Sequence, residues 1–304
     1  MSDNVPLLRL YEFMRSISGE ERLELARWIT AKPELFNEWS RRSLRFFARY
    51  SNVDEDFHPP RAELPAANTV KEIRRGYDVA VLLADRPRGR WWPVEAAPEL
   101  GFRFVDYELA PLRKTSAARV EGEPAEKAGM RADLLLVSAD GVPIVGEVKA
   151  ATATGHDTDA VLALIQGLTA CAQLLSPQQM ERLERAYPLA QFRAHSVLDL
   201  FVIAVKPAQA APSTFQDDLY EAAKELAPIL AAEPSVPARR IAFIEARFDG
   251  TLELRLATDS GTPSGTRSKA ARSRRATKLP AEPLHPDKAP RANRDPRELH
   301  PGGN

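Results

Sequence analysis

Residues Ala132–Lys149, ADLLLVSADGVPIVGEVK, decide the fold of this chain. They predict two apolar strands joined by a tight turn at Asp140-Gly141, because near-continuous apolar runs suit strands that are covered on both faces. An acid, Asp133, opens the first strand, and Glu147-Val148-Lys149 closes the second. A hairpin folds the chain back on itself, so the charged side chains emerge at the same end of the pair.

The loop of the hairpin determines whether these side chains meet. Strand side chains alternate, so Glu147 and Lys149 share one face. A two-residue loop would place Asp133 opposite Val148, on the wrong face. A three-residue loop places Asp133 opposite Glu147, and Gly141 can take the left-handed conformation that such a loop needs at its third position. A β-bulge would meet the same demand.

If the three groups converge, their chemistry suits a divalent metal. The carboxylates of Asp133 and Glu147, with the Val148 carbonyl, are hard oxygen ligands suited to Mg²⁺ or Mn²⁺. A metal lowers the pKa of a bound water and stabilises the charge that develops on a phosphate. Lys149 would orient or deprotonate the attacking water, or neutralise the transition state, and its charge offsets the repulsion between the carboxylates. This pattern predicts phosphodiester hydrolysis.

Asp133, thirteen intervening residues and then Glu147-Val148-Lys149 resemble the motif of the PD-(D/E)-x-K nuclease superfamily, which includes restriction endonucleases and RecB-like repair nucleases. The resemblance covers roughly Phe102–Ala257. It implies a four-stranded mixed sheet flanked by helices, metal-dependent phosphodiester hydrolysis, and acidic ligands at Asp133 and Glu147. Gln166, on the next predicted helix, resembles the glutamine that many RecB-like members carry.

The sequence departs from that motif at one position and leaves another open. Ala132 stands where the superfamily has its proline, a position that is often relaxed among its members. Many members also use an upstream glutamate. Glu95, Glu99 and Glu108 are the candidates here, and none is marked by its spacing. The number of metals therefore stays open.

Gln166 and His156 also have simpler explanations. Gln166 shares a helical stripe with Thr169 and Gln173, so a solvent-facing stripe explains it nearly as well. His156 follows Lys149 in a Gly-containing loop, where it would either meet substrate or face solvent.

The patterns elsewhere predict an α/β fold with a central mixed β-sheet flanked by helices, and the resemblance implies that this fold is similar to that of restriction endonucleases. Further strands are expected at 102–109, 197–205, 241–248 and 251–256. Helices are expected at 69–84, at 159–175 with Asp157 or Thr158 as the cap, and at 215–232.

The chain is expected to divide into three regions. Residues 1–60 form a small helical region, in which Ser18-x-x-Glu21 is a capping-box pattern. Residues 61–257 form the nuclease-like domain. Residues 258–304 carry 10 Lys/Arg against 5 Asp/Glu and few large apolar side chains, which predicts a disordered basic tail. Its charge either reaches nucleic acid or keeps the tail solvated.

Trp91-Trp92 lie beside Arg88 and Arg90. Aromatic side chains interleaved with arginines can stack on unpaired bases. Burial at a seam between structural units is the alternative, and the size of the two indoles favours it.

Composition excludes several classes of protein. The 304 residues are 44% apolar and 28% charged with zero formal net charge, as expected of a globular chain. Cys171 is the single cysteine, which excludes an intramolecular disulfide and a cysteine zinc site. No apolar run approaches the ~18 residues of a membrane span, and the N-terminus lacks the apolar stretch of a signal peptide. We therefore expect a cytoplasmic protein.

Two functions follow from these patterns. The first is a Mg²⁺-dependent nuclease acting on DNA, with Asp133, Glu147, Lys149 and Gln166 at the catalytic site. The alternative is a catalytically inactive protein on the same fold that serves in binding or assembly. The body of the chain carries the negative charge that balances the tail, so binding of a nucleic acid needs a local basic surface.

Overall fold

The computed structural model describes residues 6–48, 57, 63–85, 90–111, 119–120, 123–124, 130–150, 159–193, 196–206 and 214–259. The predicted disordered tail lies outside the described residues from residue 260 onward, and so do Arg88, His156, Asp157 and Thr158.

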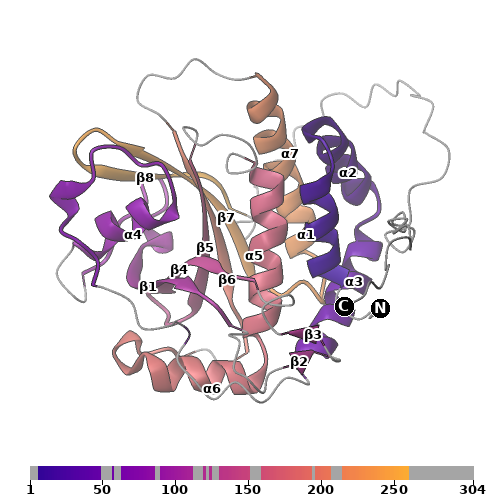
Figure 1. The fold of residues 1–304 in the computed structure, drawn as a ribbon, viewed down its shortest axis with the longest axis horizontal. Helices are drawn as coiled ribbons and strands as arrows, with labels where there is room; N and C mark the ends of the chain where they lie inside the picture. The colour runs from indigo at the N-terminus through magenta and orange to yellow at the C-terminus, as the bar shows by residue number, and fades with distance from the viewer. Residues whose placement is uncertain are drawn as a thin grey trace, which may run out of the picture. The chain divides into compact units, whose positions relative to one another are not determined.

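A six-stranded mixed sheet forms the centre of the fold (Figure 1). Its order is β1-β4-β5-β6-β7-β8, in which β5-β6 and β6-β7 are parallel and the other neighbours antiparallel. The strands are β1 (Phe102–Leu109), β4 (Ala132–Ser138), β5 (Pro143–Ala150), β6 (Asp199–Val205), β7 (Arg240–Phe248) and β8 (Leu252–Asp259), and a separate pair is formed by β2 (Arg119–Val120) and β3 (Glu123–Pro124). The predicted α/β class with a mixed sheet is confirmed.

Helices cover both faces of this sheet (Figure 1). The α-helices are α1 (Pro6–Ser16), α2 (Gly19–Ala31), α3 (Pro33–Phe47), α4 (Gly76–Ala84), α5 (Ala160–Leu174), α6 (Pro177–Ala186) and α7 (Thr214–Ala231), with short 3-10 turns η1 (Ala67–Thr69), η2 (Pro98–Leu100) and η5 (Pro188–Ala190). Because strand side chains alternate, Leu135 and Val145 pack with α5 and α7 on one face, while Leu136 and Ile144 pack with α4 on the other. This double burial explains the near-continuous apolar runs of β4 and β5.

The N-terminal helices are built on the core of the sheet domain. The capping box forms as predicted, with the Ser18 N–H donated to Glu21 Oε2 at 2.7 Å and the Glu21 N–H donated to Ser18 Oγ at 3.3 Å. Helix α1 packs on α5, and α2 packs on α7. A buried ion pair between Arg22 and Asp159, at 2.8 Å, joins α2 to the N-terminus of α5.

The structure differs from the predicted helices at three points. Helix α4 begins at Gly76 and not at residue 69, because the Asp78 carboxylate accepts the N–H groups of residues 74 and 75 and holds the chain extended before the helix. Asp159 itself caps α5, by accepting the Leu162 N–H at 2.9 Å. Helix α6 lies outside the predicted helices, because Ser176-Pro177 is as typical of a helix end as of the cap and first residue of a new helix, which is the part it plays here.

The segment between α4 and β1 draws the two edges of the sheet together. Trp92 pairs with Phe102 in β1, and Glu95 pairs with Arg255 in β8. Three residues span at most about 10 Å and each pairing adds about 4.8 Å, so the edges can lie at most about 20 Å apart, whereas six flat strands would hold them about 24 Å apart. The sheet therefore curls around the α4 side.

The single cysteine, Cys171, is fully buried in the core. Among the described residues, no single helix has both the length and the apolar character needed to cross a membrane.

The buried Arg22–Asp159 pair predicts a test of how the N-terminal helices are attached. Arg22→Met and Asp159→Ser should each lower the free energy of unfolding by about 3–5 kcal/mol, because each leaves an uncompensated buried charge. The double variant should cost clearly less than the sum, since it removes both charges and serine keeps a capping oxygen. Urea unfolding gives the free energy of unfolding of the wild type and of the three variants.

An exposed ion pair provides the matched control. Arg41→Ala removes the partner of exposed Glu38 and should cost no more than about 1 kcal/mol. If the losses in free energy of unfolding of Arg22→Met and Asp159→Ser simply add in the double variant, the two side chains do not stabilise each other, and the ion pair does not attach the N-terminal helices.

Candidate active site

The β4–β5 hairpin has the three-residue loop that places Asp133 opposite Glu147. The Ser138 N–H is donated to the Val142 carbonyl at 3.0 Å, and Gly141 has a φ of 81°. Leu134 pairs with Gly146, so the register continues to place Asp133 opposite Glu147. The predicted turn geometry is confirmed, and the two-residue alternative is wrong.

The Asp133 carboxylate lies where the two strands separate. The Val148 N–H is donated to Asp133 Oδ2 at 2.8 Å and not to a backbone carbonyl of β4. At the start of α4, a Cβ on Gly76 would lie only 3.0 Å from Asp133 Cγ. A hydrogen bond on one side and a closely approaching glycine on the other thus fix the position of this acid.

The Glu147 carboxylate is completely buried on the α5 side of the sheet. A Cβ on Gly167 of α5 would lie 3.1 Å from Glu147 Cγ, so the absence of a side chain there makes room for the acid. Neither carboxylate oxygen of Glu147 accepts a hydrogen bond from a donor group within the described parts of the chain. A buried carboxylate without donors is costly, and a proton or a cation lowers that cost.

Burial raises the pKa of both acids. Burial is the largest cause for Asp133, and it is opposed by the Lys149 charge and the Val148 N–H. For Glu147 burial acts together with the negative charge of Asp133 and places the pKa well above the usual range. A protonated Glu147 can donate to Asp133, which supplies the hydrogen bond that two ionised carboxylates could not form.

Lys149 and Gln166 lie in the same cluster. Lys149 Nζ donates to Gln166 Oε1 at 3.3 Å, and Gln166 Nε2 donates to the backbone carbonyl of Arg131 at 3.3 Å. The solvent-facing stripe proposed as an alternative is wrong, because Thr169 and Gln173 are buried. The Gln166 amide instead links the lysine to the chain entering β4.

Of the three upstream glutamates, Glu108 lies beside the acids. The β1–β4 register places Glu108 opposite Asp133, and its charge raises the Asp133 pKa. Its φ of 50° lies in the left-handed region, which is strained for a non-glycine residue and is common at functional sites. The backbone of Glu95 instead pairs with β8, and Glu99 lies in η2.

Tyr11 is a member of the cluster that the sequence did not indicate. Its hydroxyl donates to Gln166 Oε1 at 3.5 Å from helix α1. Burial is the largest cause of its raised pKa, and the charges of Lys149, Glu147 and Asp133 all act on it. No local pattern marks this tyrosine, because only the packing of α1 on α5 brings it to the site.

Exposed arginines lie around the cluster. Arg74 and Arg75 immediately precede the glycine that contacts Asp133, and Arg131 lies two residues before Asp133. The Arg15 guanidinium lies 5.7 Å from the centre of the Tyr11 ring. Glu72 pairs with Arg74 at 3.0 Å and Asp78 lies 3.9 Å from Arg75, so carboxylates offset part of this positive charge.

Comparison of the chain with protein-family models, with curated proteins and with solved structures found no match. The relationship to PD-(D/E)-x-K nucleases therefore depends on Asp133, Glu147, Lys149 and Gln166 and their arrangement, and it stays a prediction.

The raised pKa values of the two acids predict the pH response of the metal-free protein. The folded state holds these protons more tightly than the unfolded chain, in which carboxyl groups titrate near pH ~4. Their stabilising contribution is therefore complete at or below that pH and is lost as the pH rises through the folded-state pKa. In EDTA we expect the free energy of unfolding to fall as the pH rises from about 5 to 8.

Glu147→Gln should remove most of this fall, because the amide stays neutral. The exposed Glu221→Gln is the control and should keep the wild-type pH dependence. Urea unfolding at a series of pH values gives the slopes. Parallel slopes for wild type and Glu147→Gln would show that the pair does not hold a proton.

Proposed function

We propose that this chain is a metal-dependent nuclease that hydrolyses phosphodiester bonds in DNA. The observation that carries this proposal is the buried Glu147 carboxylate, which no side-chain donor among the described residues satisfies and which lies beside Asp133 and Lys149 at the open end of the β4–β5 hairpin. Such an arrangement is costly for a purely structural role.

The residues present fit a Mg²⁺ or Mn²⁺ ion. Asp133, Glu147 and the Val148 carbonyl would hold it, with Glu108 as the adjacent third acid. Mg²⁺ usually takes one or two carboxylates and keeps several waters, and within the described ranges no group of three His, Cys, Asp or Glu side chains is already arranged around one point. When bound, the ion would acidify a water and stabilise charge on the phosphoryl oxygens.

Lys149 supplies the positive charge of the site. Gln166 accepts a hydrogen bond from its ammonium group, and Tyr11 and the Arg131 carbonyl hold the Gln166 amide in turn. The lysine would stabilise the negative charge that grows on the phosphoryl oxygens as water attacks phosphorus and the P–O bond to the leaving oxygen breaks. Gln166 and Tyr11 act as positioning residues.

The surrounding arginines suit a polyanionic substrate. Arg15, Arg74, Arg75 and Arg131 are exposed near the carboxylates, which supports the local basic surface that a neutral chain needs. Contacts to phosphate do not distinguish DNA from RNA. The choice of DNA follows the resemblance to restriction and repair nucleases.

Lys149→Met tests the proposal, because methionine keeps the length of the side chain but removes the charge. We expect wild type to cleave labelled DNA with Mg²⁺ or Mn²⁺ and not with EDTA, and the variant to be slower by about 10²–10³-fold. Circular dichroism verifies the fold, and Lys224→Met on the surface of α7 is the control. Equal, metal-independent traces of cleavage from wild type and Lys149→Met would overturn the proposal. Binding of DNA by wild type without cleavage would favour the inactive binding protein instead.

Tyr11→Phe tests the part that the N-terminal helices play. Loss of the hydroxyl removes one of the three hydrogen bonds that hold the Gln166 amide, so we expect kcat to fall by about three- to tenfold with little change in KM. The pH dependence of kcat should also shift, since the orientation of Lys149 changes. Tyr220→Phe removes a buried hydroxyl on α7 and is the matched control. An unchanged kcat and pH profile would mean that Tyr11 only fills space.

A further inference from the structure

Two adjoining cavities lie at the opposite end of β4 from the acids. The larger has a volume of about 480 Å³ and the smaller about 240 Å³. Val137 lines the larger cavity and Ser138 the smaller. Val137 lies four residue steps along the strand from Asp133, which is about 13 Å. The two cavities, here called the arginine-lined pocket, are thus distinct from the candidate active site.

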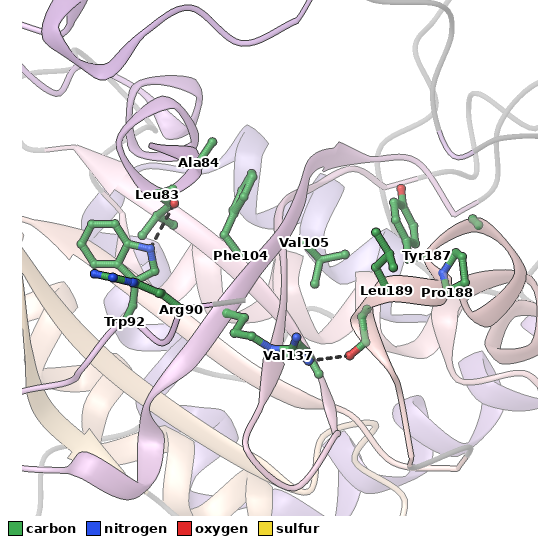
Figure 2. Close-up of a pocket in the computed structure, with 13 residues that line it drawn as sticks. Leu83, Ala84, Arg90, Trp92, Phe104, Val105, Val137, Tyr187, Pro188 and Leu189 are labelled. Carbon is green, nitrogen blue, oxygen red and sulfur yellow. Dashed lines mark hydrogen bonds between the residues drawn. The ribbon is translucent and has the colours of Figure 1, made fainter. Parts of the chain in front are cut away.

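The larger cavity has mainly apolar walls. Figure 2 shows Phe104, Val105, Tyr187 and Leu189 around it. Leu189 is 75% exposed and borders this cavity, and Trp91 is 40% exposed and borders the smaller one. Exposed large apolar side chains beside a cavity are typical of a binding site.

Arg103 lines both cavities and is held in place by its neighbours. Its Nη2 donates to the Ala190 carbonyl at 2.8 Å, and its guanidinium lies 5.2 Å from the centre of the Trp91 ring. The guanidinium is therefore held in one orientation at the junction of the two cavities, and its planar group carries more N–H donors than the single bond to the Ala190 carbonyl uses.

Positive charge dominates the pocket. Arg90 lines the larger cavity and Arg193 the smaller, and among the described residues that line either cavity there is no carboxylate. The nearby Asp140 is bonded to Ser138 Oγ and Arg239, so its charge is already compensated. The Arg193 N–H is donated to the Gly141 carbonyl at 2.9 Å, which fixes this arginine beside the hairpin loop.

We propose that the arginine-lined pocket binds a nucleoside phosphate, with the base in the larger cavity and the phosphate between Arg103 and Arg193. The larger volume lies within the range of about 300–1,000 Å³ that small-molecule sites occupy. Guanidinium groups bind phosphate through paired hydrogen bonds, and bases stack on aromatic side chains. A free nucleotide and the unpaired end of a nucleic acid strand share this chemistry.

Binding of a nucleoside phosphate in the arginine-lined pocket does not depend on the proposed hydrolysis. The variants that test it leave Asp133, Glu147 and Lys149 unchanged, and the binding measurements are made in EDTA. A failure of cleavage would leave the expected binding intact, and a failure of binding would leave the expected cleavage intact.

The experiment measures binding of three kinds of probe to the full chain by isothermal titration calorimetry. The probes are the four nucleoside monophosphates, a ten-nucleotide single strand with and without a 5′-phosphate, and inorganic phosphate. Arg193→Ala keeps the Cβ that packs on Gly141, and Arg103→Lys keeps the charge but loses the planar fork. Arg27→Ala on the exposed face of α2 is the control.

A nucleoside monophosphate should bind wild type and the control equally, and Arg193→Ala and Arg103→Lys about tenfold more weakly. If only the strand binds, with the same sensitivity to both variants and to removal of the 5′-phosphate, the ligand is a strand end. Inorganic phosphate binding as tightly as the nucleotides would overturn the proposal. So would unaltered binding in both variants, or no binding of nucleotides and strands to wild type.

Discussion

The hydrogen bond from the Val148 N–H to the Asp133 carboxylate is the contact on which the candidate site depends. It forms where the β4–β5 ladder ends, so a side chain replaces the backbone acceptor that the next strand position would have supplied. Asp133 is thereby held between the strands, next to the buried Glu147. The loop that ends at Gly141 sets this register, because a hairpin shorter by one residue would turn Asp133 to the other face.

Much of the fold could be predicted because the strands have strong local patterns. The apolar runs of β4 and β5, the capping box at Ser18 and the glycine of the hairpin loop each act within a few residues of sequence. The predictions were wrong where one sequence pattern is typical of two structures, or where a helix boundary depends on a single side chain. Ser176-Pro177 both ends α5 and starts α6, and the start of α4 depends on a single aspartate side chain.

The candidate site was predictable only in part, for a similar reason. Asp133, Glu147 and Lys149 belong to one hairpin, so their proximity follows from one loop length. Tyr11 lies 155 positions from Gln166 in the sequence, and no spacing rule connects them. Glu108 was one of three equal candidates until the pairing of β1 with β4 placed it opposite Asp133.

The short segment that pairs with both β1 and β8 has a consequence for the behaviour of the protein in solution. Outer strands of open sheets carry unpaired N–H and C=O groups, which can recruit strands of other molecules and start aggregation. Trp92 occupies such groups at the start of β1, and Glu95 occupies them on β8. A few residues of one connection thus cover part of each margin of the sheet, which reduces the backbone that is open to edge-to-edge association.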